Sequence, residues 1–345
     1  MLGQKLVFGF HGKTLPEEFK NLLREYKIGN VILFLRNVES AEQLRALCAE
    51  IQSLVQEETG YPAFIIIDQE GGMVTRLPQD AVNVPGAMSL AATADPENAR
   101  LASEITIRQL RGLGANFNMA PVLDVNSNPA NPVIGVRSFG DEAERVASLG
   151  CAAIAPYAGS GVLCCAKHFP GHGWPVADSH LALPVDERSE QQLRADMAVY
   201  QSLSLELDAV MTAHVAFEAF DGHTATFEPR LIRDILRGEF GFAGLVFSDD
   251  LSMKGAGGES PLERARRALS SGCDAILYCN HPDEVDEVLG SLEWRREERF
   301  SARFSRLLPR GEAASDLAAL RASETYRSAR RTLERAGFEA AFEGI

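Results

Sequence analysis

Eight apolar runs of strand length constrain the fold of this chain more than any other feature. They cover residues 6–10, 30–34, 63–68, 116–125, 162–169, 207–214, 244–250 and 273–280. The runs are continuously apolar rather than alternating, which is typical of parallel strands covered on both faces. Amphipathic stretches of helix length, such as PEEFKNLLREY and EPRLIRDILRGEFG, separate them. The pattern therefore predicts an α/β fold in which parallel strands are joined by helical crossovers.

Eight strand-helix units fit a (β/α)8 TIM barrel better than an open doubly wound sheet. No GxGxxG motif, the phosphate-binding signature of many doubly wound sheets, follows the first apolar run. The units end near residue 290 of a chain of 345 residues. We therefore expect a catalytic barrel over residues 1–293 and a C-terminal helical extension over residues 294–345, packed on the barrel. The locally basic segment WRREERFSARFSRLLPRGE is interpreted as a solvated helix face rather than a partner-binding tail.

Composition and charge exclude several kinds of partner. Asp and Glu number 48 against 34 Lys and Arg, which gives a formal net charge of −14. Nucleic-acid grooves and anionic membrane surfaces need clustered basic residues, so we expect no nucleic-acid and no membrane partner. The first apolar run is too short for a signal peptide, and no apolar stretch reaches the ~20 residues that span a bilayer. Six cysteines without a CxxC pair indicate reduced thiols, and we expect a cytoplasmic location.

Polar side chains stand where six of the apolar runs stop. In a TIM barrel the strand ends meet at one face, where active sites are built. A strand end also turns polar simply on reaching solvent, so the combination carries the argument and no single residue does. The residues are Asp68, Asp124, Lys167 with His168, His214, Asp249 with Asp250, and Asn280.

The densest group of reactive side chains is KHFPGHGWPVADSH, residues 167–180, which its glycines and prolines mark as a loop. Asp178 stands two residues before His180, so its carboxylate can accept the imidazole N–H and favour the protonated ring. We therefore expect His180 to act as a general acid or base. Two alternatives stay open: His168 and His172 pin the loop through backbone hydrogen bonds, or the histidines bind a metal ion. We expect no metal and no other cofactor, because the first strand offers only His11 and no HxH pair.

Three weaker motifs accompany this loop. In FSDDLSM, the two aspartates can supply a nucleophile with a structural neighbour, a metal site or a helix cap, and we assign the cap to Asp250. In IDQEGGMVTRL, Asp68 and Arg76 flank a pair of glycines that permits a close backbone approach. In NPVIGVRSFGDE, Arg137 stands on a long loop. Each of the last two is unspecific by itself.

Together, DQEGG, GVRSFG, KHFPGHGxxxxDSH and FSDDLSM resemble the β-N-acetylhexosaminidases of glycoside hydrolase family 3. These are single-domain bacterial enzymes that remove β-linked N-acetylglucosamine during peptidoglycan recycling. The resemblance runs from about residue 5 to about residue 290, and KHFPGHG followed by DSH is its most specific element. It implies an exo-acting, retaining enzyme that hydrolyses terminal N-acetyl-β-D-glucosamine from muropeptide fragments without a cofactor.

The resemblance also implies a role for individual residues. Asp249 matches the nucleophile that forms a covalent glycosyl-enzyme, and His180, held by Asp178, matches an acid/base that replaces the usual carboxylic acid. The positions that hold the terminal sugar are Asp68, Arg76, Arg137, Lys167 and His168. The chain departs from relatives at Met73, Thr75 and Val136, where polar, basic or acidic residues are common, and we expect an altered rim of the sugar pocket.

Trp174 and Pro175 give the loop after the fifth strand a hydrophobic tip. Gly171 and Gly173 are interpreted as hinges, so we expect the tip to close over the sugar and carry the acid/base into position. Aromatic residues make up 8% of the chain and include two tryptophans, which argues against a long stacking cleft for polysaccharides. A pocket for one terminal sugar is favoured.

Three other functions remain open on the residues alone. A β-glucosidase, or a phosphorylase in which phosphate replaces water, would use the same residues, and a histidine acid/base avoids the repulsion between a carboxylate and phosphate. A metal-dependent hydrolase would use the histidine loop and lose activity in excess chelator. A non-catalytic sugar-binding barrel would have no reason to combine Asp249 with the pair of Asp178 and His180.

Overall fold

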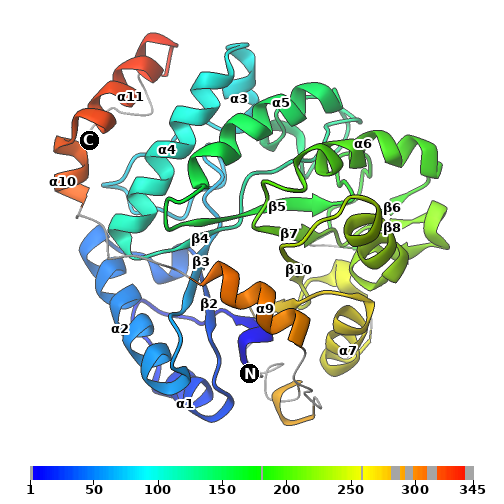
Figure 1. Ribbon diagram of the computed structural model, residues 1–345, viewed down its shortest axis with the longest axis horizontal. Helices are drawn as coiled ribbons and strands as arrows, with labels where there is room; N and C mark the ends of the chain where they lie inside the picture. The colour runs from blue at the N-terminus through cyan, green and yellow to red at the C-terminus, as the bar shows by residue number, and fades with distance from the viewer. Residues whose placement is uncertain are drawn as a thin grey trace.

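The barrel strands form as the apolar runs predict. The computed structural model describes residues 3–179, 182–257, 259–280, 288–291, 298–308 and 317–338. Eight parallel strands close into a barrel in which each strand pairs with the next barrel strand along the chain, and the last pairs with the first. The predicted (β/α)8 fold is therefore confirmed (Figure 1). The strands are β1 (Leu6–Phe8), β2 (Asn30–Leu33), β3 (Phe64–Ile67), β4 (Phe117–Asn118), β5 (Leu163–Phe169), β7 (Ala209–Thr212), β10 (Leu245–Asp250) and β11 (Ala275–Tyr278).

Helices surround the barrel and begin and end at the residues that the sequence marks. The helix α4 shows this pattern: the Asp95 side chain accepts a hydrogen bond from the backbone N–H of Glu97, Pro96 occupies the first turn, and Gly114 ends the helix with φ +89°. The crossover helices are α1 (Glu17–Tyr26), α2 (Ala41–Thr59), α3 (Ala87–Ala92), α4 (Pro96–Leu113), α5 (Ala143–Ile154), α6 (Glu190–Leu203), η7 (Arg230–Glu239) and α7 (Pro261–Ser271). Of these, η7 is wound as a π-helix.

Shorter elements decorate the ends of the barrel. A small sheet of β6 (Val185–Asp186), β8 (Ala216–Phe217) and β9 (His223–Thr224) joins the loops that follow β5 and β7. The 3-10 helices are η1 (Gly3–Lys5), η2 (Leu35–Asn37), η3 (Gly135–Arg137), η4 (Ala155–Tyr157), η5 (Glu218–Phe220), η6 (Ala225–Phe227) and η8 (Lys254–Ala256). Within the described residues, no helix is both long and apolar enough to cross a membrane.

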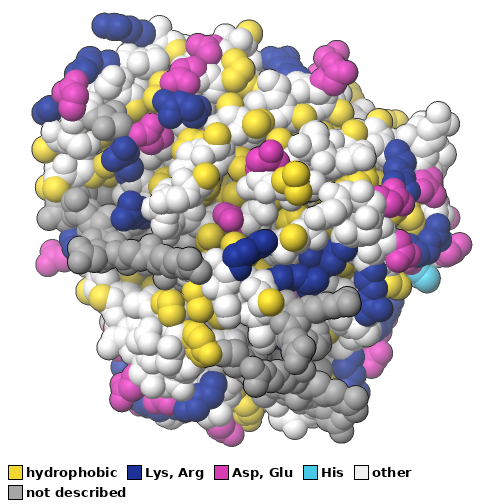
Figure 2. Space-filling model, viewed as in Figure 1, with side chains coloured by type: hydrophobic (Ala, Val, Ile, Leu, Met, Phe, Trp, Pro, Cys, Tyr) yellow, Lys and Arg dark blue, Asp and Glu magenta, His cyan; other side chains and the backbone are white. Residues whose placement is uncertain are grey.

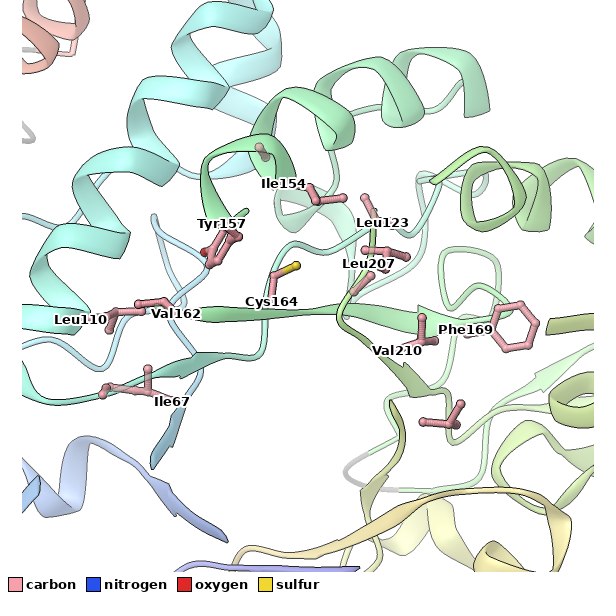
Figure 3. Packing of buried hydrophobic residues seen from close by; sticks show 14 of the residues in the cluster. Ile67, Leu110, Leu123, Ile154, Tyr157, Val162, Cys164, Phe169, Leu207 and Val210 are labelled. Carbon is pink, nitrogen blue, oxygen red and sulfur yellow. The ribbon is translucent and has the colours of Figure 1, made fainter. Parts of the chain in front are cut away.

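The core has two layers, one inside the barrel and one between strands and helices. Figure 3 shows the outer layer, where Ile67 of β3 and Cys164 of β5 face the surrounding helices and Ile154 of α5 lies opposite. The inner layer consists of alternate strand residues such as Phe64 and Phe117, whose rings meet edge to face at 5.4 Å between centroids. Burial on both faces explains why the strands are continuously apolar in sequence.

A helix after the last strand completes the inner layer, and this corrects the interpretation of the basic segment as a solvated face. The helix α9 (Glu298–Leu307) buries Phe300, Phe304 and Leu307 against the barrel interior, and the ring of Phe304 lies 4.9 Å from that of Phe64. Because Phe64 begins β3, α9 closes the end of the barrel where the strands start (Figure 1).

The arginines of α9 bind the same end of the barrel. Arg303 donates to the carboxylate of Asp274 at 2.7 Å, and Arg306 donates to the carbonyl oxygen of Ala243 at 3.1 Å. Figure 2 shows Lys and Arg side chains gathered near α9 on this face. The basic segment therefore serves intramolecular packing as well as solvation.

Two further C-terminal helices pack on the barrel wall. The helices α10 (Leu317–Ala322) and α11 (Glu324–Arg335) both contact α4 (Figure 1). The predicted domain boundary at residue 293 lies outside the described residues and stays a prediction.

The predicted strand 116–125 is shorter than expected. The strand β4 ends at Asn118, because Pro121 lacks the N–H that the hydrogen-bond ladder of a sheet needs.

Candidate active site

The C-terminal ends of the barrel strands surround a cavity of about 210 Å³. Residues from β5 and β10 and from the loops after β2, β3, β4 and β11 line it, so the predicted convergence of strand ends is found. Among the lining residues are six to which the sequence assigns catalysis or sugar binding: Asp68, Arg76, Arg137, Lys167, His168 and Asp249.

Local irregularities in two strands allow neighbouring residues to share this cavity. In a regular strand, successive side chains point to opposite faces. The pairing of β5 with β7 shifts register between Ala166 and Phe169, and the intervening Lys167 and His168 both line the cavity. The pairing of β10 with β11 shifts likewise between Phe247 and Asp250, on either side of Asp249. Such irregularities re-aim side chains near active sites.

Four charged side chains form a buried chain of ion pairs along one wall. The Lys167 ammonium lies 2.7 Å from Asp68 Oδ1 and 2.7 Å from Glu70 Oε1. Arg137 donates to both oxygens of Glu70, at 2.9 and 2.8 Å. Burial alone would raise the pKa of Glu70, but Lys167 and Arg137 outweigh it and hold that pKa well below its usual value. Burial would lower the pKa of Lys167, and the two carboxylates raise it above its usual value.

A second buried carboxylate fixes the two histidines after β5. Asp124 accepts a hydrogen bond from His168 Nδ1 at 2.7 Å and another from the backbone N–H of His172 at 2.7 Å. The His168 tautomer is thereby set, with Nδ1 protonated. His172 Nε2 hydrogen-bonds Ser179 Oγ at 3.1 Å, and burial lowers the pKa of His172 to about 4. The two imidazoles do hold this segment, but through the side chains of Asp124 and Ser179 rather than through the backbone hydrogen bonds that the alternative invoked.

The carboxylate of Asp249 is partly exposed and stays ionised despite its surroundings. Its Oδ1 accepts the backbone N–H of Asp250 at 2.8 Å. Burial would raise the pKa of Asp249, but the imidazoles of His214 and His168, with Lys167, lower it below its usual value. His214 is buried behind it, with its Nε2 3.0 Å from the carbonyl oxygen of Asp250. An anionic carboxylate at a cavity wall is a competent nucleophile.

The predicted helix cap at Asp250 is wrong. Its Oδ1 accepts the backbone N–H and the hydroxyl of Ser252 and the backbone N–H of Cys279, and its Oδ2 accepts from the Asn280 amide. The next α-helix is capped instead by Ser260. Asp250 therefore ties the end of β10 to the end of β11, because its carboxylate reaches backbone donors on the neighbouring strand.

The proposed acid/base pair is only partly within the described residues. His180 lies outside them. Asp178 lies in the loop after β5, where its carbonyl oxygen accepts the backbone N–H of Ala182 at 3.0 Å, and Ser179 lines the cavity beside it. The carbonyl oxygen of Ser179 accepts the backbone N–H of Gly255 at 2.9 Å, so the residue before His180 is held against η8.

The predicted hinge at Gly173 is wrong, because this glycine serves a close approach. A Cβ atom at Gly173 would lie 1.7 Å from the carbonyl oxygen of Val125. The side-chain amide of Asn131 donates to the carbonyl oxygens of His172 and Pro175, at 2.8 and 2.6 Å. Residues 172–175 are therefore anchored to the loop after β4, and any movement of the acid/base segment must begin after Pro175.

The departures at Met73 and Val136 do not face the sugar cavity. Both line a neighbouring cavity of about 150 Å³ between the loop after β3, α3 and α4, and their exposed fractions are 72% and 53%. Glu70 and Arg137 line both cavities and so form the wall between them. The expectation that these departures alter the rim of the sugar pocket is thereby corrected. Within the described ranges, no group of three or more His, Cys, Asp or Glu side chains is arranged so that it could hold a metal ion.

Sequence reasoning missed Glu70 as a site residue. Its position two residues after Asp68 was a usable signal, because residues i and i+2 of an extended segment lie on the same side. It also missed the role of Asp124 in orienting His168, although a fully buried aspartate among apolar residues requires specific partners.

Comparison with known proteins supplies an independent line of evidence. The model of the glycosyl hydrolase family 3 N-terminal domain matches residues 4–309. A β-hexosaminidase of Alkalilimnicola ehrlichii is 41% identical over 301 residues, which cover 85% of each chain. One of Pseudomonas aeruginosa is 37% identical over 318 residues, 90% of this chain and 92% of that one. The crystal structure of NagZ from Neisseria gonorrhoeae in complex with N-trifluoroacetyl-D-glucosamine is 35% identical, with a TM-score of 0.85 over 96% of this chain and 97% of that one.

Proposed function

Because the chain belongs to glycoside hydrolase family 3 and is a β-hexosaminidase, we propose that it is an exo-acting, retaining enzyme that removes terminal N-acetyl-β-D-glucosamine. The observation that carries this proposal is the ionised carboxylate of Asp249 at the wall of a small cavity with hydrogen-bonding groups on several sides. A family relative binds N-trifluoroacetyl-D-glucosamine, which supports a sugar with a 2-acylamino group as the ligand.

In this mechanism Asp249 attacks the anomeric carbon while His180 protonates the leaving oxygen, and a covalent glycosyl-aspartate forms. His180, now neutral, then removes a proton from water, which attacks the anomeric carbon and releases the sugar with its β-configuration. Asp178 orients His180 and favours its protonated form. The lowered pKa of Asp249 suits this role, because the nucleophile must be anionic before attack.

Five residues are proposed to hold the terminal sugar. Arg76, whose guanidinium makes no ion pair within the described residues, is free to donate to the ligand. His168 presents Nε2 to the cavity, because Asp124 occupies Nδ1. The complete set is Asp68, Arg76, Arg137, Lys167 and His168. Hydroxyl groups of a sugar match such a mixture of fixed donors and acceptors.

The dimensions of the cavity favour removal of one sugar at a time. A volume of about 210 Å³ is below the range of roughly 300 Å³ and more that drug-sized ligands occupy, so a single ring fits and a chain does not. We propose muropeptide fragments as substrates and the cytoplasm as the location. The six cysteines, none of which forms a disulfide, support a reducing compartment.

The decisive experiment compares an aryl N-acetyl-β-glucosaminide with the matching β-glucoside. We expect hydrolysis of the first, weak hydrolysis of the second, and a loss of more than about a thousandfold for Asp249→Ala. Proton NMR of the first product must show the β-anomer, and an α-anomer would refute double displacement. Turnover that needs phosphate, or that stops with excess chelator, would refute hydrolysis without a cofactor. Sugar binding without turnover would refute the enzyme.

A further inference from the structure

Glu70 is the central member of the buried ion pairs, and both of its carboxylate oxygens are bonded to cations. One oxygen lies 2.7 Å from the Lys167 ammonium and 2.8 Å from a guanidinium nitrogen of Arg137, and the other lies 2.9 Å from the Arg137 Nε. The side chains of Glu70, Lys167 and Arg137 are 7%, 4% and 14% exposed. Arg137 has a further bond to the carbonyl oxygen of Val133 at 3.2 Å, so its plane is fixed from two sides.

Stability alone does not explain this arrangement. Taking several charges out of water costs several kcal/mol per ion, and well-packed apolar residues often stabilise a protein as much as a buried ion pair does. Both cations line the sugar cavity, and Glu70 lies with Arg137 in the wall between this cavity and the neighbouring one. Both oxygens of Glu70 are already bonded to the two cations. Glu70 thus stands behind two groups that can donate to a ligand, in the way that outer partners orient binding residues.

We propose that Glu70 is a positioning residue for the terminal sugar: its carboxylate fixes the spacing and orientation of the Lys167 ammonium and the Arg137 guanidinium. This inference rests on the proposed function, because it assumes that the two cations hold sugar hydroxyls. Because both oxygens of Glu70 are bonded to the two cations, it acts through them rather than through a bond of its own to the sugar. Its effect reaches the reaction through the hydrogen bonds of its two partners, which must be preorganised to stabilise the transition state.

The charges that face the Lys167 ammonium define the pH dependence that follows. Asp68 and Glu70 favour its protonated form, Arg137 disfavours it, and Asp249 lies across the cavity as another anion. Removing the charge of Glu70 leaves Asp68 as the close counterion, while Arg137 remains. Lys167 then deprotonates at lower pH, because one of its two nearest stabilising charges is gone. A role in packing alone would not produce such a change.

Two variants and a control test the proposal. Glu70→Gln keeps the shape and removes the charge, and Glu70→Asp keeps the charge but is one methylene too short to reach both cations. The control is Glu104→Gln, which removes a glutamate that also pairs with two arginines, Arg100 and Arg108, on the surface of α4. kcat and KM are measured at pH 7 on an aryl N-acetyl-β-glucosaminide. The affinity for N-acetyl-D-glucosamine is measured by calorimetry between pH 7 and 11, with the fraction of folded protein checked by circular dichroism at each pH.

For Glu70→Gln we expect kcat/KM at pH 7 to fall at least tenfold and the loss of sugar affinity at alkaline pH to begin about one pH unit lower than in the parent. Binding is the readout for this shift because it does not require His180 to act as an acid. Glu70→Asp should restore the pH dependence of binding without restoring kcat/KM, and Glu104→Gln should stay within about twofold of the parent. An unmoved pH dependence of binding in Glu70→Gln, or a kcat/KM equal to that of the parent, overturns the proposal.

A binding measurement separates this inference from the proposed function. Calorimetric titration with N-acetyl-D-glucosamine reports on the cavity without requiring turnover. If the parent binds the sugar but hydrolyses nothing, the proposed function fails, and an affinity at least tenfold weaker in Glu70→Gln still supports the positioning role. Equal affinities for the parent and Glu70→Gln overturn it. A parent that neither binds nor hydrolyses overturns both.

Discussion

The lowered pKa of His172 predicts a specific loss of stability in mild acid. His172 is 1% exposed, and its pKa of about 4 lies below the ordinary value of 6.5 because burial disfavours the charged ring. As the pH falls through 6.5, the unfolded chain binds a proton at this residue and the folded protein does not. The stability contributed by the neutral ring is therefore complete above pH 6.5 and is lost progressively down to pH 4.

The size of this effect follows from the two pKa values. At pH 5 the unfolded histidine is almost fully protonated while the folded one is almost neutral, which corresponds to about 2 kcal/mol of lost folding free energy. His172→Gln removes the titrating group and keeps a side chain that can hydrogen-bond Ser179. The variant should therefore lose about 2 kcal/mol less than the parent between pH 7 and pH 5, whatever its stability at pH 7.

Equilibrium unfolding in urea at both pH values measures this difference. His11→Gln is the matched control, because His11 is exposed and hydrogen-bonds a backbone carbonyl oxygen rather than a buried group. The control should follow the parent at both pH values. A pH-dependent loss in His172→Gln within about 0.5 kcal/mol of the parent's loss would refute the argument that burial keeps His172 neutral.

Three further substitutions test the site and the packing of α9 against the barrel interior. Gly173→Ala should reduce kcat/KM by more than tenfold, because its Cβ would overlap the carbonyl oxygen of Val125; steady-state kinetics with wild-type values would contradict the close approach. Trp174→Ala should lower turnover severalfold, because the ring is 37% exposed, packs on Arg188 at 5.0 Å and belongs to the anchored segment from which the acid/base loop continues; an unchanged kcat would count against this anchoring role. Phe304→Ala should cost about 3–5 kcal/mol in urea unfolding, and a loss under 1 kcal/mol would show that α9 does not complete the core.

The sequence alone predicts the barrel well because its strands are buried on both faces. That constraint makes each run continuously apolar, and the eight strands fall within the eight predicted ranges. The interpretation of the segment around α9 fails for a related reason. Its many arginines dominate the composition, although Phe300, Phe304 and Leu307 recur at helical spacing and mark one apolar face.

Site residues that stand at the end of a strand can be predicted from the sequence. Hydrogen bonds between site residues that are far apart in the sequence cannot. Asp68 and Asp249 follow from strand ends. The bond from Arg137 to Glu70 spans 67 residues and that from His168 to Asp124 spans 44, so only closure of the barrel brings these partners together. Local shifts in strand register are likewise invisible in the sequence pattern, since they depend on how a neighbouring strand pairs.

Because α9 closes the end of the barrel where the strands start, the barrel interior cannot be completed until the C-terminal part of the chain has been synthesised. The centroid of the Phe300 ring lies 5.1 Å from the ammonium of Lys5, next to the first strand. Residues about 300 positions apart must therefore meet before α9 covers this end of the barrel. A nascent chain that ends before residue 307 would expose to water the phenylalanine rings of the inner layer that α9 covers. The open barrel would then be an aggregation-prone intermediate, and we expect chaperones to bind it until α9 leaves the ribosome.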